Sequence, residues 1–210
     1  MTVSNLNEHV KAIIEVGKRM GQKNYTPGYS GNLSVRLGNN VLITTSGSSN
    51  GFLTENDLVL MDFNAKPINS DKKPSSEKFL HIEFYKQRKD INAVIHTHPA
   101  ALTAFASAGL DLTEPVMPEN VYYFGGIPLA EYGMPSSDDL VKNTSKFFKD
   151  YDAILMANHG VIIGGKDLED AYQKLEIAEE YAKSIIYAKI LGGTKVLSKE
   201  DADKVLSLRG

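Results

Sequence analysis

The sequence predicts an α/β protein with helices on both sides of a mainly antiparallel sheet. Two apolar segments, residues 32–37 and 41–45, flank the Gly-Asn-Asn sequence of residues 38–40. Glycine and asparagine tolerate the positive φ of tight turns, so this arrangement indicates a β-hairpin and argues against an all-parallel sheet. Near both ends of the chain, apolar residues recur at helical spacing, which predicts the helices on the two sides of the sheet.

In the first half of the chain, each element is predicted from the spacing of its apolar residues and from the residues at its ends. In chain order these elements are a helix over residues 10–20, the hairpin, a strand over 58–62, a helix begun by Ser75 or Ser76 and running to Tyr85, a strand over 91–95 and an alanine-rich helix over 99–108. Serine is a favoured first residue because its hydroxyl accepts a hydrogen bond from a free backbone N–H of the first turn.

The second half begins with a loop-rich region over residues 109–136. It continues with a helix from Ser137 through Phe148, strands over 153–156 and 161–163, a long amphipathic helix over 168–185 and a short helix that starts at Ser198. Neither an internal repeat nor a linker divides the sequence. A single domain over residues 1–210 is therefore expected.

The composition excludes several classes of protein. Hydrophobic residues make up 42% and charged residues 23% of the chain, and the net charge is −3, so neither nucleic acid nor an anionic membrane is an expected partner. No apolar run approaches the ~20 residues that a membrane span needs, and the first residues lack the apolar centre of a secretion signal. A cytoplasmic protein is expected. Because the chain has no cysteine, nitrogen and oxygen atoms must bind any metal.

Three histidines follow strand-like segments and suggest a metal site. His96 and His98 close the strand at 91–95, where positions two apart share a face, and His159 follows the strand at 153–156. Three neutral imidazoles can hold zinc or a similar divalent ion and leave one coordination position for substrate. The alternative is a polar His-x-His-Pro turn whose imidazoles bond to backbone. We favour the metal site, because this single motif contains two of the five histidines of the chain.

A zinc peptidase of the JAMM type is a rival interpretation, because Ser107 and Asp111 follow the histidine pair. Both gaps are one residue longer than in that pattern, however, and one residue turns a helical side chain by ~100° away from the metal. The rival also leaves His159 unused, so we reject it.

The motif Pro74-Ser75-Ser76-Glu77 is the second candidate feature. Two hydroxyls and free backbone N–H groups at a helix start can bind an anion, and the Glu77 carboxylate can bind a metal or move a proton. The same motif is also an ordinary helix cap. His81 lies one helical turn after Glu77 and is either a further metal ligand or, as we favour, a structural partner or core residue.

Two loops rich in glycine and small hydroxyl residues are the third feature, residues 28–32 and 44–49. Backbone donors in such loops can cradle phosphate without a strong positive charge. Neither loop fits a Walker or dinucleotide-binding glycine pattern. Together with the two serines of the previous motif, they make a plausible three-part phosphate site.

In this order, the motifs Gly31-Asn32, Thr44-Thr45-Ser46-Gly47, Pro74-Ser75-Ser76-Glu77, His96-Thr97-His98 and Asn158-His159-Gly160 resemble those of the class II aldolase/adducin family. The resemblance runs from about Glu15 to about Ala188. It implies a three-layer α/β/α fold with a central, mostly antiparallel sheet, assembled as a homotetramer with active sites between subunits. It implies one zinc or similar ion per subunit, bound by His96, His98 and His159, with Glu77 as acid/base that can also occupy the metal. Substrate phosphate would contact Gly31, Asn32, Ser46, Gly47, Ser75 and Ser76.

The resemblance implies a metal-dependent aldolase that cleaves a ketose 1-phosphate, such as L-fuculose 1-phosphate, into dihydroxyacetone phosphate and an aldehyde. The alternatives within the family are a decarboxylase of a phosphorylated sugar acid and a methylthioribulose-phosphate dehydratase. A pentulose-phosphate 4-epimerase is less favoured because family epimerases carry Asp at the position of Glu77. A non-catalytic adducin-like module is disfavoured by the intact histidines.

Family aldolases also use tyrosines of a neighbouring subunit to protonate the departing aldehyde. The central tyrosine would correspond to Tyr122 or Tyr123, although Glu119 is an alternative acid and packing is the ordinary role of such aromatics. The tail after Ala188 offers no tyrosine at all. The aldehyde half of the substrate is therefore left undetermined by the sequence.

Overall fold

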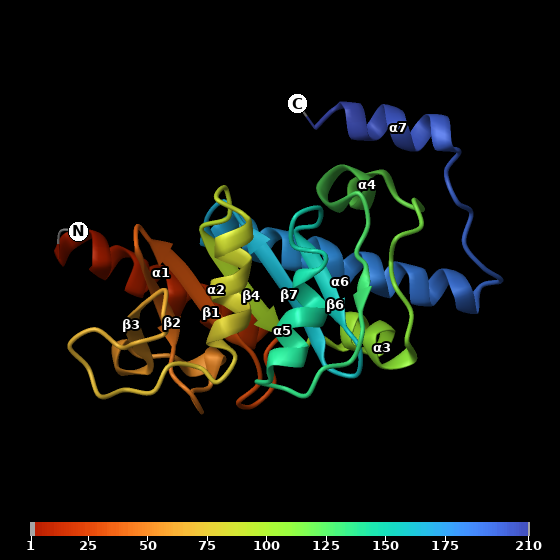
Figure 1. Ribbon diagram of the computed structural model, residues 1–210. Coiled ribbons are helices and arrows are strands. Elements are labelled where there is room, and N and C mark those ends of the chain that lie inside the picture. Colours follow the sequence, from red (N-terminus) through yellow and green to blue (C-terminus); the bar gives the residue numbers. More distant parts are fainter. Residues whose placement is uncertain (1–2, 210) are drawn as a thin grey trace.

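The protein is built around a seven-stranded sheet in the order β3-β2-β1-β4-β7-β6-β5 (Figure 1). The computed structural model describes residues 3–209. All neighbouring strands are antiparallel except β5 and β6, which are parallel. The strands are β1 (Asn32–Leu37), β2 (Asn40–Thr44), β3 (Leu58–Asp62), β4 (Ala93–Thr97), β5 (Leu129–Ala130), β6 (Ala153–Met156) and β7 (Gly160–Gly165).

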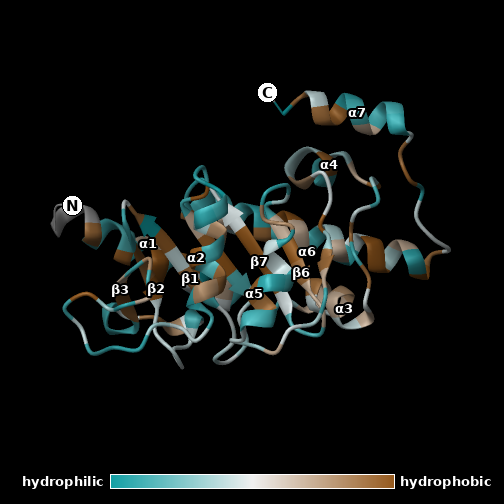
Figure 2. Ribbon diagram, viewed as in Figure 1, coloured by the Kyte–Doolittle hydropathy of each residue, from teal (hydrophilic) through white to brown (hydrophobic). Residues whose placement is uncertain are grey.

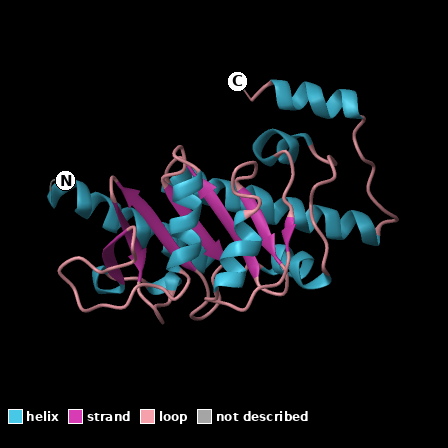
Figure 3. Ribbon diagram, viewed as in Figure 1, coloured by secondary structure: helices cyan, strands magenta, loops and turns pink. Residues whose placement is uncertain are grey.

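Helices cover both faces of this sheet, as Figures 1 and 3 show. One face packs against α1 (Val3–Gln22), α3 (Ala100–Ala108) and α6 (Leu168–Ile190). The other packs against α2 (Lys78–Gln87) and α5 (Asp138–Ser145). The remaining helical elements are α4 (Pro118–Phe124), α7 (Lys199–Ser207) and two short 3₁₀ turns, η1 (Asn50–Phe52) and η2 (Glu55–Asp57). The predicted three-layer α/β/α architecture is confirmed.

Two hydrophobic cores, one on each face of the sheet, explain why the strands read as continuous apolar runs. In β4, Ala93 and Ile95 pack into the core beneath α1, α3 and α6, whereas Val94 packs into the core beneath α2 and α5. Successive side chains of a strand point to opposite faces, and here both faces are covered. Hydrophobic residues accordingly concentrate in the strands and in the sheet-facing sides of the helices (Figure 2).

The helix starts show how serine and aspartate define the element boundaries. The side chains of Ser137, Asp167 and Ser198 each accept a hydrogen bond from a backbone N–H three residues on, at 2.8–3.2 Å. The predictions at Ser137 and Ser198 are confirmed. Helix α3 has no such residue of its own; instead the buried carboxylate of Glu179 on α6 accepts the N–H groups of Ala101 and Leu102, both at 3.0 Å.

Two of the boundaries that differ from the prediction are the start of α2 and the end of α5. Helix α2 begins at Lys78, so Ser75 and Ser76 precede it and Glu77 occupies its N-cap position. The hydroxyl of Ser75 accepts the N–H of Glu77 and holds this turn outside the helix. Helix α5 ends at Ser145, three residues before Phe148, which is buried in the core.

The region predicted to be loop-rich contains α4 and the two-residue strand β5. Helix α4 has Pro118 at its first turn and ends at Gly125, whose φ of +71° is left-handed. Proline at the start of a helix and glycine after its end are a recognised helix signature. Here the other prolines of residues 109–136 made the whole stretch resemble a loop, so this signature was overlooked. Within residues 3–209, no helix combines the length and the apolar character that a membrane crossing requires.

Candidate metal centre and active site

The three predicted ligand histidines come together because β4 and β7 are neighbours in the sheet. His96 lies in β4, opposite Asn32 of β1 on one side and Ile162 of β7 on the other. His98 follows β4 directly, and His159 sits in the tight turn between β6 and β7. Chain segments more than sixty residues apart thus meet at one edge of the sheet.

The imidazoles converge within the reach of a single cation. One ligand nitrogen from each of His96, His98 and His159 lies within 4.8 Å of the others, and the Nε2 atoms of His96 and His98 are 3.2 Å apart. Two ligands of a tetrahedral ion with bonds of about 2.0–2.1 Å are about 3.3 Å apart. The donor set and its spacing therefore fit a divalent metal.

Hydrogen bonding and burial prepare these rings for metal binding. The Nδ1 of His96 donates to the Val161 carbonyl at 2.9 Å, so Nε2 is the nitrogen directed at the cluster. Burial lowers the pKa of His96, but Glu77 and the Val161 carbonyl outweigh it and raise that pKa overall, so a metal would displace this proton. Burial, together with positive charge on His96, lowers the pKa of His98 to about 3 and that of His159 to about 4. Neutral imidazole is the form that binds a metal.

Glycine is required at two positions around the histidines. A side chain at Gly160 would place its Cβ 2.5 Å from Cδ2 of His98 and 2.6 Å from the Thr97 carbonyl oxygen. At Gly31, where φ is +77°, a Cβ would lie 2.5 Å from the His96 carbonyl oxygen. Close backbone approach therefore brings the turn of His159 and the loop before β1 against β4.

Glu77, the predicted acid/base, lies beside the imidazoles of His96 and His159. Its Oε2 is 3.0 Å from Nε2 of His96, its Oε1 is 3.4 Å from Nε2 of His159, and the Asn32 amide donates to Oε2 at 3.1 Å. Burial opposes ionisation of Glu77, but His96, His159 and Asn32 outweigh it and hold its pKa well below the ordinary value. The carboxylate is therefore ionised and can act as a metal ligand or a proton acceptor.

A cavity of about 220 Å³ opens over this carboxylate. All six residues predicted to hold phosphate line it: Gly31, Asn32, Ser46, Gly47, Ser75 and Ser76. Its lining contains Glu77, His96 and His98 but neither lysine nor arginine. Among the described residues, no hydrogen bond uses the backbone N–H of Gly47 or Ser76. The cavity thus offers an anion hydroxyl and N–H donors next to the candidate metal ligands.

Several residues of the cavity lining are not predicted by the sequence. Tyr29 and Ser30 belong to the loop at residues 28–32, but only Gly31 and Asn32 of that loop are predicted to hold phosphate. The Ser30 hydroxyl is buried and has no partner among the described residues. Pro135 and Ser136 come from the segment before α5 and carried no signal in the sequence beyond that of a turn.

His81 does not belong to the histidine cluster. It is fully buried on α2 and reaches Glu77 only through Asn32, which contacts both residues. The favoured prediction of a structural partner or core histidine is consistent with this position, and the fourth-ligand alternative is not.

Tyr122 and Tyr123 are not brought to the cavity of their own subunit. Both lie on α4, are more than a third exposed and contact each other at a ring-centroid distance of 5.0 Å. Neither they nor Glu119 line the cavity. Because the prediction assigns them to the site of a neighbouring subunit, a single chain leaves it untested.

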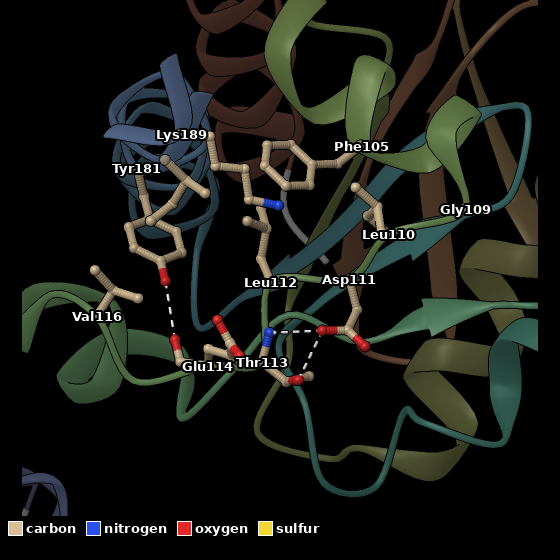
Figure 4. A pocket seen from close by; sticks show the side chains of 11 residues that line it. Phe105, Gly109, Leu110, Asp111, Leu112, Thr113, Glu114, Val116, Tyr181 and Lys189 are labelled. Carbon is tan, nitrogen blue, oxygen red and sulfur yellow. Dashed lines mark hydrogen bonds between the residues drawn. The ribbon is translucent and has the colours of Figure 1, made fainter. Parts of the chain in front are cut away.

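A second cavity lies away from the histidine cluster and Glu77. A cavity of about 390 Å³ between α3 and α6 is lined by Phe105, Tyr181 and Lys189 among others (Figure 4). There the Tyr181 hydroxyl donates to the Glu114 carbonyl, and Asp111 accepts two bonds from Thr113. These groups satisfy one another, and none of them belongs to the predicted site.

Comparison with known proteins decides the family. The model of the Class II Aldolase and Adducin N-terminal domain matches residues 11–186. This chain belongs to that family. It is 39% identical over 173 residues to L-fuculose phosphate aldolase of Methanocaldococcus jannaschii, covering 82% of this chain and 93% of that protein. It is 35% identical over 204 residues to 3-oxo-tetronate 4-phosphate decarboxylase of Haemophilus influenzae, covering 94% and 95%.

A solved structure of an L-fuculose 1-phosphate aldolase superposes with a TM-score of 0.90 at 30% identity, covering 99% of this chain and 97% of that one. The comparisons confirm the predicted family, the predicted fold and an aldolase-type lyase. This class II aldolase is therefore an enzyme whose histidine cluster has the composition of a metal site.

Proposed function

We propose that this class II aldolase cleaves a ketose 1-phosphate, such as L-fuculose 1-phosphate, into dihydroxyacetone phosphate and an aldehyde. The convergence of His96, His98 and His159 beside the Glu77 carboxylate is the observation that carries the proposal. The names of the similar aldolases support the substrate class. We propose zinc as the metal, one ion per subunit, because three imidazoles favour it over the harder divalent ions.

The residues fit such an ion because the site has unused ligand atoms. Oε1 of Glu77 is buried without a hydrogen-bond partner among the described residues, as is Nδ1 of His159. Buried polar atoms without partners are rare in folded proteins and need a reason. A divalent cation bound here would supply Lewis-acid polarisation of the substrate carbonyl.

The side chains of the cavity would divide the remaining work. Hydroxyl and N–H donors of Ser46, Gly47, Ser75 and Ser76 would hold the phosphate and fix the reacting carbons relative to Glu77. In the condensation direction, the ionised Glu77 would take a proton from the carbon of dihydroxyacetone phosphate that forms the new bond, and in cleavage it would return that proton to the same carbon. Tyr122 or Tyr123 of a neighbouring subunit would protonate the aldehyde oxygen during condensation, and in cleavage would take the proton back from the hydroxyl that becomes the aldehyde carbonyl.

This last role requires an assembly, and we propose a homotetramer with active sites between subunits. The exposed position of both tyrosines on α4, outside the cavity of their own chain, supports this arrangement. The single domain over residues 1–210 and the cytoplasmic location stay predictions from the sequence.

A decarboxylase of a phosphorylated sugar acid is the second candidate, supported by the similarity to the Haemophilus influenzae enzyme over nearly the whole chain. A panel of ketose 1-phosphates and phosphorylated 3-oxo sugar acids, offered to zinc-loaded protein, separates the two. Release of dihydroxyacetone phosphate and an aldehyde from a ketose 1-phosphate, without carbon dioxide, supports the aldolase; the phosphate product is measured with a coupled NADH-consuming dehydrogenase. Decarboxylation of a 3-oxo-tetronate 4-phosphate also leaves dihydroxyacetone phosphate, so carbon dioxide is measured in parallel. Release of carbon dioxide from the sugar acid, with no cleavage of any ketose 1-phosphate, refutes the aldolase in favour of the decarboxylase.

A further inference from the structure

A chain of buried polar side chains runs from Glu77 into the protein interior between β1 and α2. The Asn32 amide contacts Glu77 at 3.1 Å and His81 on its other side. His81 in turn contacts Ser34 at 2.7 Å, and Ser34 contacts the Tyr85 hydroxyl at 2.7 Å. His81, Ser34 and Tyr85 are completely buried, and Asn32 and Glu77 are at most 8% exposed.

The spacing of these residues shows how the two elements are interlocked. Asn32 and Ser34 are two apart on β1 and face α2, because Leu33 and Val35 between and beyond them pack into the opposite core. His81 and Tyr85 are four apart on α2 and face β1. The polar side chains therefore alternate between strand and helix through a layer that is otherwise apolar, apart from Arg36 at its far end, whose guanidinium lies over the Tyr85 ring.

Such an arrangement costs stability unless something else requires it. Removing polar groups from water is unfavourable, and their hydrogen bonds only offset the loss. Apolar residues of similar shape would fill this layer at least as favourably. Packing alone does not explain this chain of polar groups. It ends at the Glu77 carboxylate, and this contact connects the chain to the candidate site.

Chemistry fixes the direction of every hydrogen bond in the chain. An ionised carboxylate only accepts, so the Asn32 amide must turn its NH₂ group toward Glu77 and its oxygen toward His81. An amide oxygen also only accepts, so Nε2 of His81 must carry a hydrogen. Burial lowers the pKa of His81 to about 3, so the ring is neutral and its Nδ1 is a bare acceptor.

The remaining two bonds follow from this tautomer. Ser34 must donate its hydroxyl hydrogen to Nδ1 of His81, and its oxygen is then free to accept from Tyr85. Burial raises the pKa of Tyr85, so its hydroxyl stays protonated and donates. All donors point the same way, from Tyr85 toward Glu77, and aligned hydrogen bonds polarise one another.

We propose that His81 is a positioning residue for Glu77, acting through Asn32. A neutral His81 with its hydrogen on Nε2 holds the Asn32 amide in the one orientation that donates to Glu77. This fixes Oε2 of Glu77 and leaves Oε1 3.4 Å from Nε2 of His159. The role in turnover rests on the proposed function, whereas the tautomer and the direction of the chain do not.

Two substitutions at position 81 separate positioning from packing. His81→Gln keeps an N–H donor near the place of Nε2, whereas His81→Met fills the space without a donor. We expect His81→Met to lower kcat about 100-fold with KM within about threefold, the size of effect that misplaced proton transfer produces. His81→Gln is expected to retain kcat within about fivefold of the wild type. Tyr85→Phe, which removes only the far end of the chain, should lower kcat by less than His81→Met.

A measurement on the wild type tests the chain without any substrate. Imidazole ¹⁵N chemical shifts of histidine-labelled protein, with and without zinc, should show His81 neutral with its hydrogen on Nε2. A hydrogen on Nδ1, or a charged ring, would overturn the proposal. Zinc content should stay at about one ion per subunit in all three variants, because His81 does not contact the metal ligands.

The outcomes distinguish this proposal from the proposed function. If the wild type cleaves no ketose 1-phosphate, the proposed aldolase function is refuted. The ¹⁵N shifts of His81 still show in which direction the hydrogen bonds between Tyr85 and Glu77 run. A His81→Met variant with wild-type kcat overturns the positioning role. Equal losses in His81→Met and His81→Gln, with matching drops in unfolding temperature, overturn it as well, because they indicate packing alone.

Discussion

His96 binds different partners with its two ring nitrogens, and this division is central to the candidate site. Nδ1 is held by the Val161 carbonyl, so Nε2 is directed at Glu77 and the neighbouring imidazoles. Glu77 in turn is held by Asn32 from the opposite side. His96 and Glu77 are therefore each oriented by a contact outside the cluster, which lowers the cost of ordering them around a cation.

The role of Glu77 predicts a separation of metal binding from turnover. Glu77→Gln preserves the shape of the side chain but removes the proton acceptor. We expect kcat to fall by about 10²- to 10⁴-fold while the three imidazoles keep the zinc. Metal analysis and steady-state kinetics measure both quantities. Glu83→Gln, on α2 and hydrogen-bonded within residues 3–209 only to Gln87, is the control that should stay active. Normal turnover in Glu77→Gln would contradict the assigned role.

The close contact at Gly160 predicts an effect on metal affinity. In Gly160→Ala the new Cβ overlaps Cδ2 of His98 and the Thr97 carbonyl, so His98 must move. Displacing an orienting contact of a metal ligand lowers affinity by about 10- to 100-fold, which a competition titration with a chromophoric chelator measures. Gly38→Ala places a side chain at a positive φ in open space. That control should weaken folding but leave zinc affinity unchanged; equal zinc affinities in the two variants would exclude our explanation.

At the scale of elements, the position of α3 depends on a residue far away in sequence. Helix α3 follows His98 and Pro99 directly, and its first free N–H groups are bound by Glu179 of α6. A buried carboxylate at a helix start is favourable because it compensates for both the free donors and the helix dipole. The segment that carries His96 and His98 is thus anchored to the helical layer behind it.

This contact predicts a loss of stability in Glu179→Gln. The amide can accept one of the two bonds but turns an N–H toward the other donor, which leaves a buried polar group unpaired. We expect the free energy of unfolding to fall by about 1–3 kcal/mol in urea denaturation at fixed protein concentration. Glu180→Gln, an exposed neighbour paired with Lys183, should change it by less than about 0.5 kcal/mol. Equal effects of the two changes would rule out the capping role.

In the whole molecule, the cavity beside Glu77 and the tyrosines of α4 lie apart. The cavity lies where β1, β4 and the start of α2 come together, and the tyrosines of α4 lie outside it. A single chain therefore brings together the candidate metal ligands and the loops proposed to bind phosphate, but not the tyrosines proposed to act on the aldehyde half. The proposed tetramer would unite them across a subunit boundary.

Subunit mixing tests this arrangement. We expect Glu77→Gln and the double change Tyr122→Phe with Tyr123→Phe to be nearly inactive when each is prepared alone. Mixed assemblies of the two should regain activity, because some boundaries then combine an intact Glu77 with intact tyrosines. Activity is compared with that of each parent at the same total concentration. A double tyrosine variant with wild-type activity, or mixtures no more active than the parents, would contradict an aldehyde acid supplied by the neighbour.

Most of the elements, and most of the residues that line the candidate site, could be predicted from the amino-acid sequence. Period-two and helical spacing located the hairpin, the strands at 58–62 and 153–156 and the long helix α6, because these patterns follow from which faces are buried. The motifs around Glu77, His96 and His159 identified the chemistry because each is local: a few neighbouring residues of the right type.

Only the tertiary structure decided what joins those local motifs. No spacing in the sequence reveals that Asn32 bridges Glu77 and His81, that Glu179 caps α3, or that Pro135 and Ser136 complete the cavity. Each is a contact between residues brought together by strand order and helix packing. The physical reason is that a pattern along the chain records which face of an element is buried, but not which distant side chain will be found on the other side.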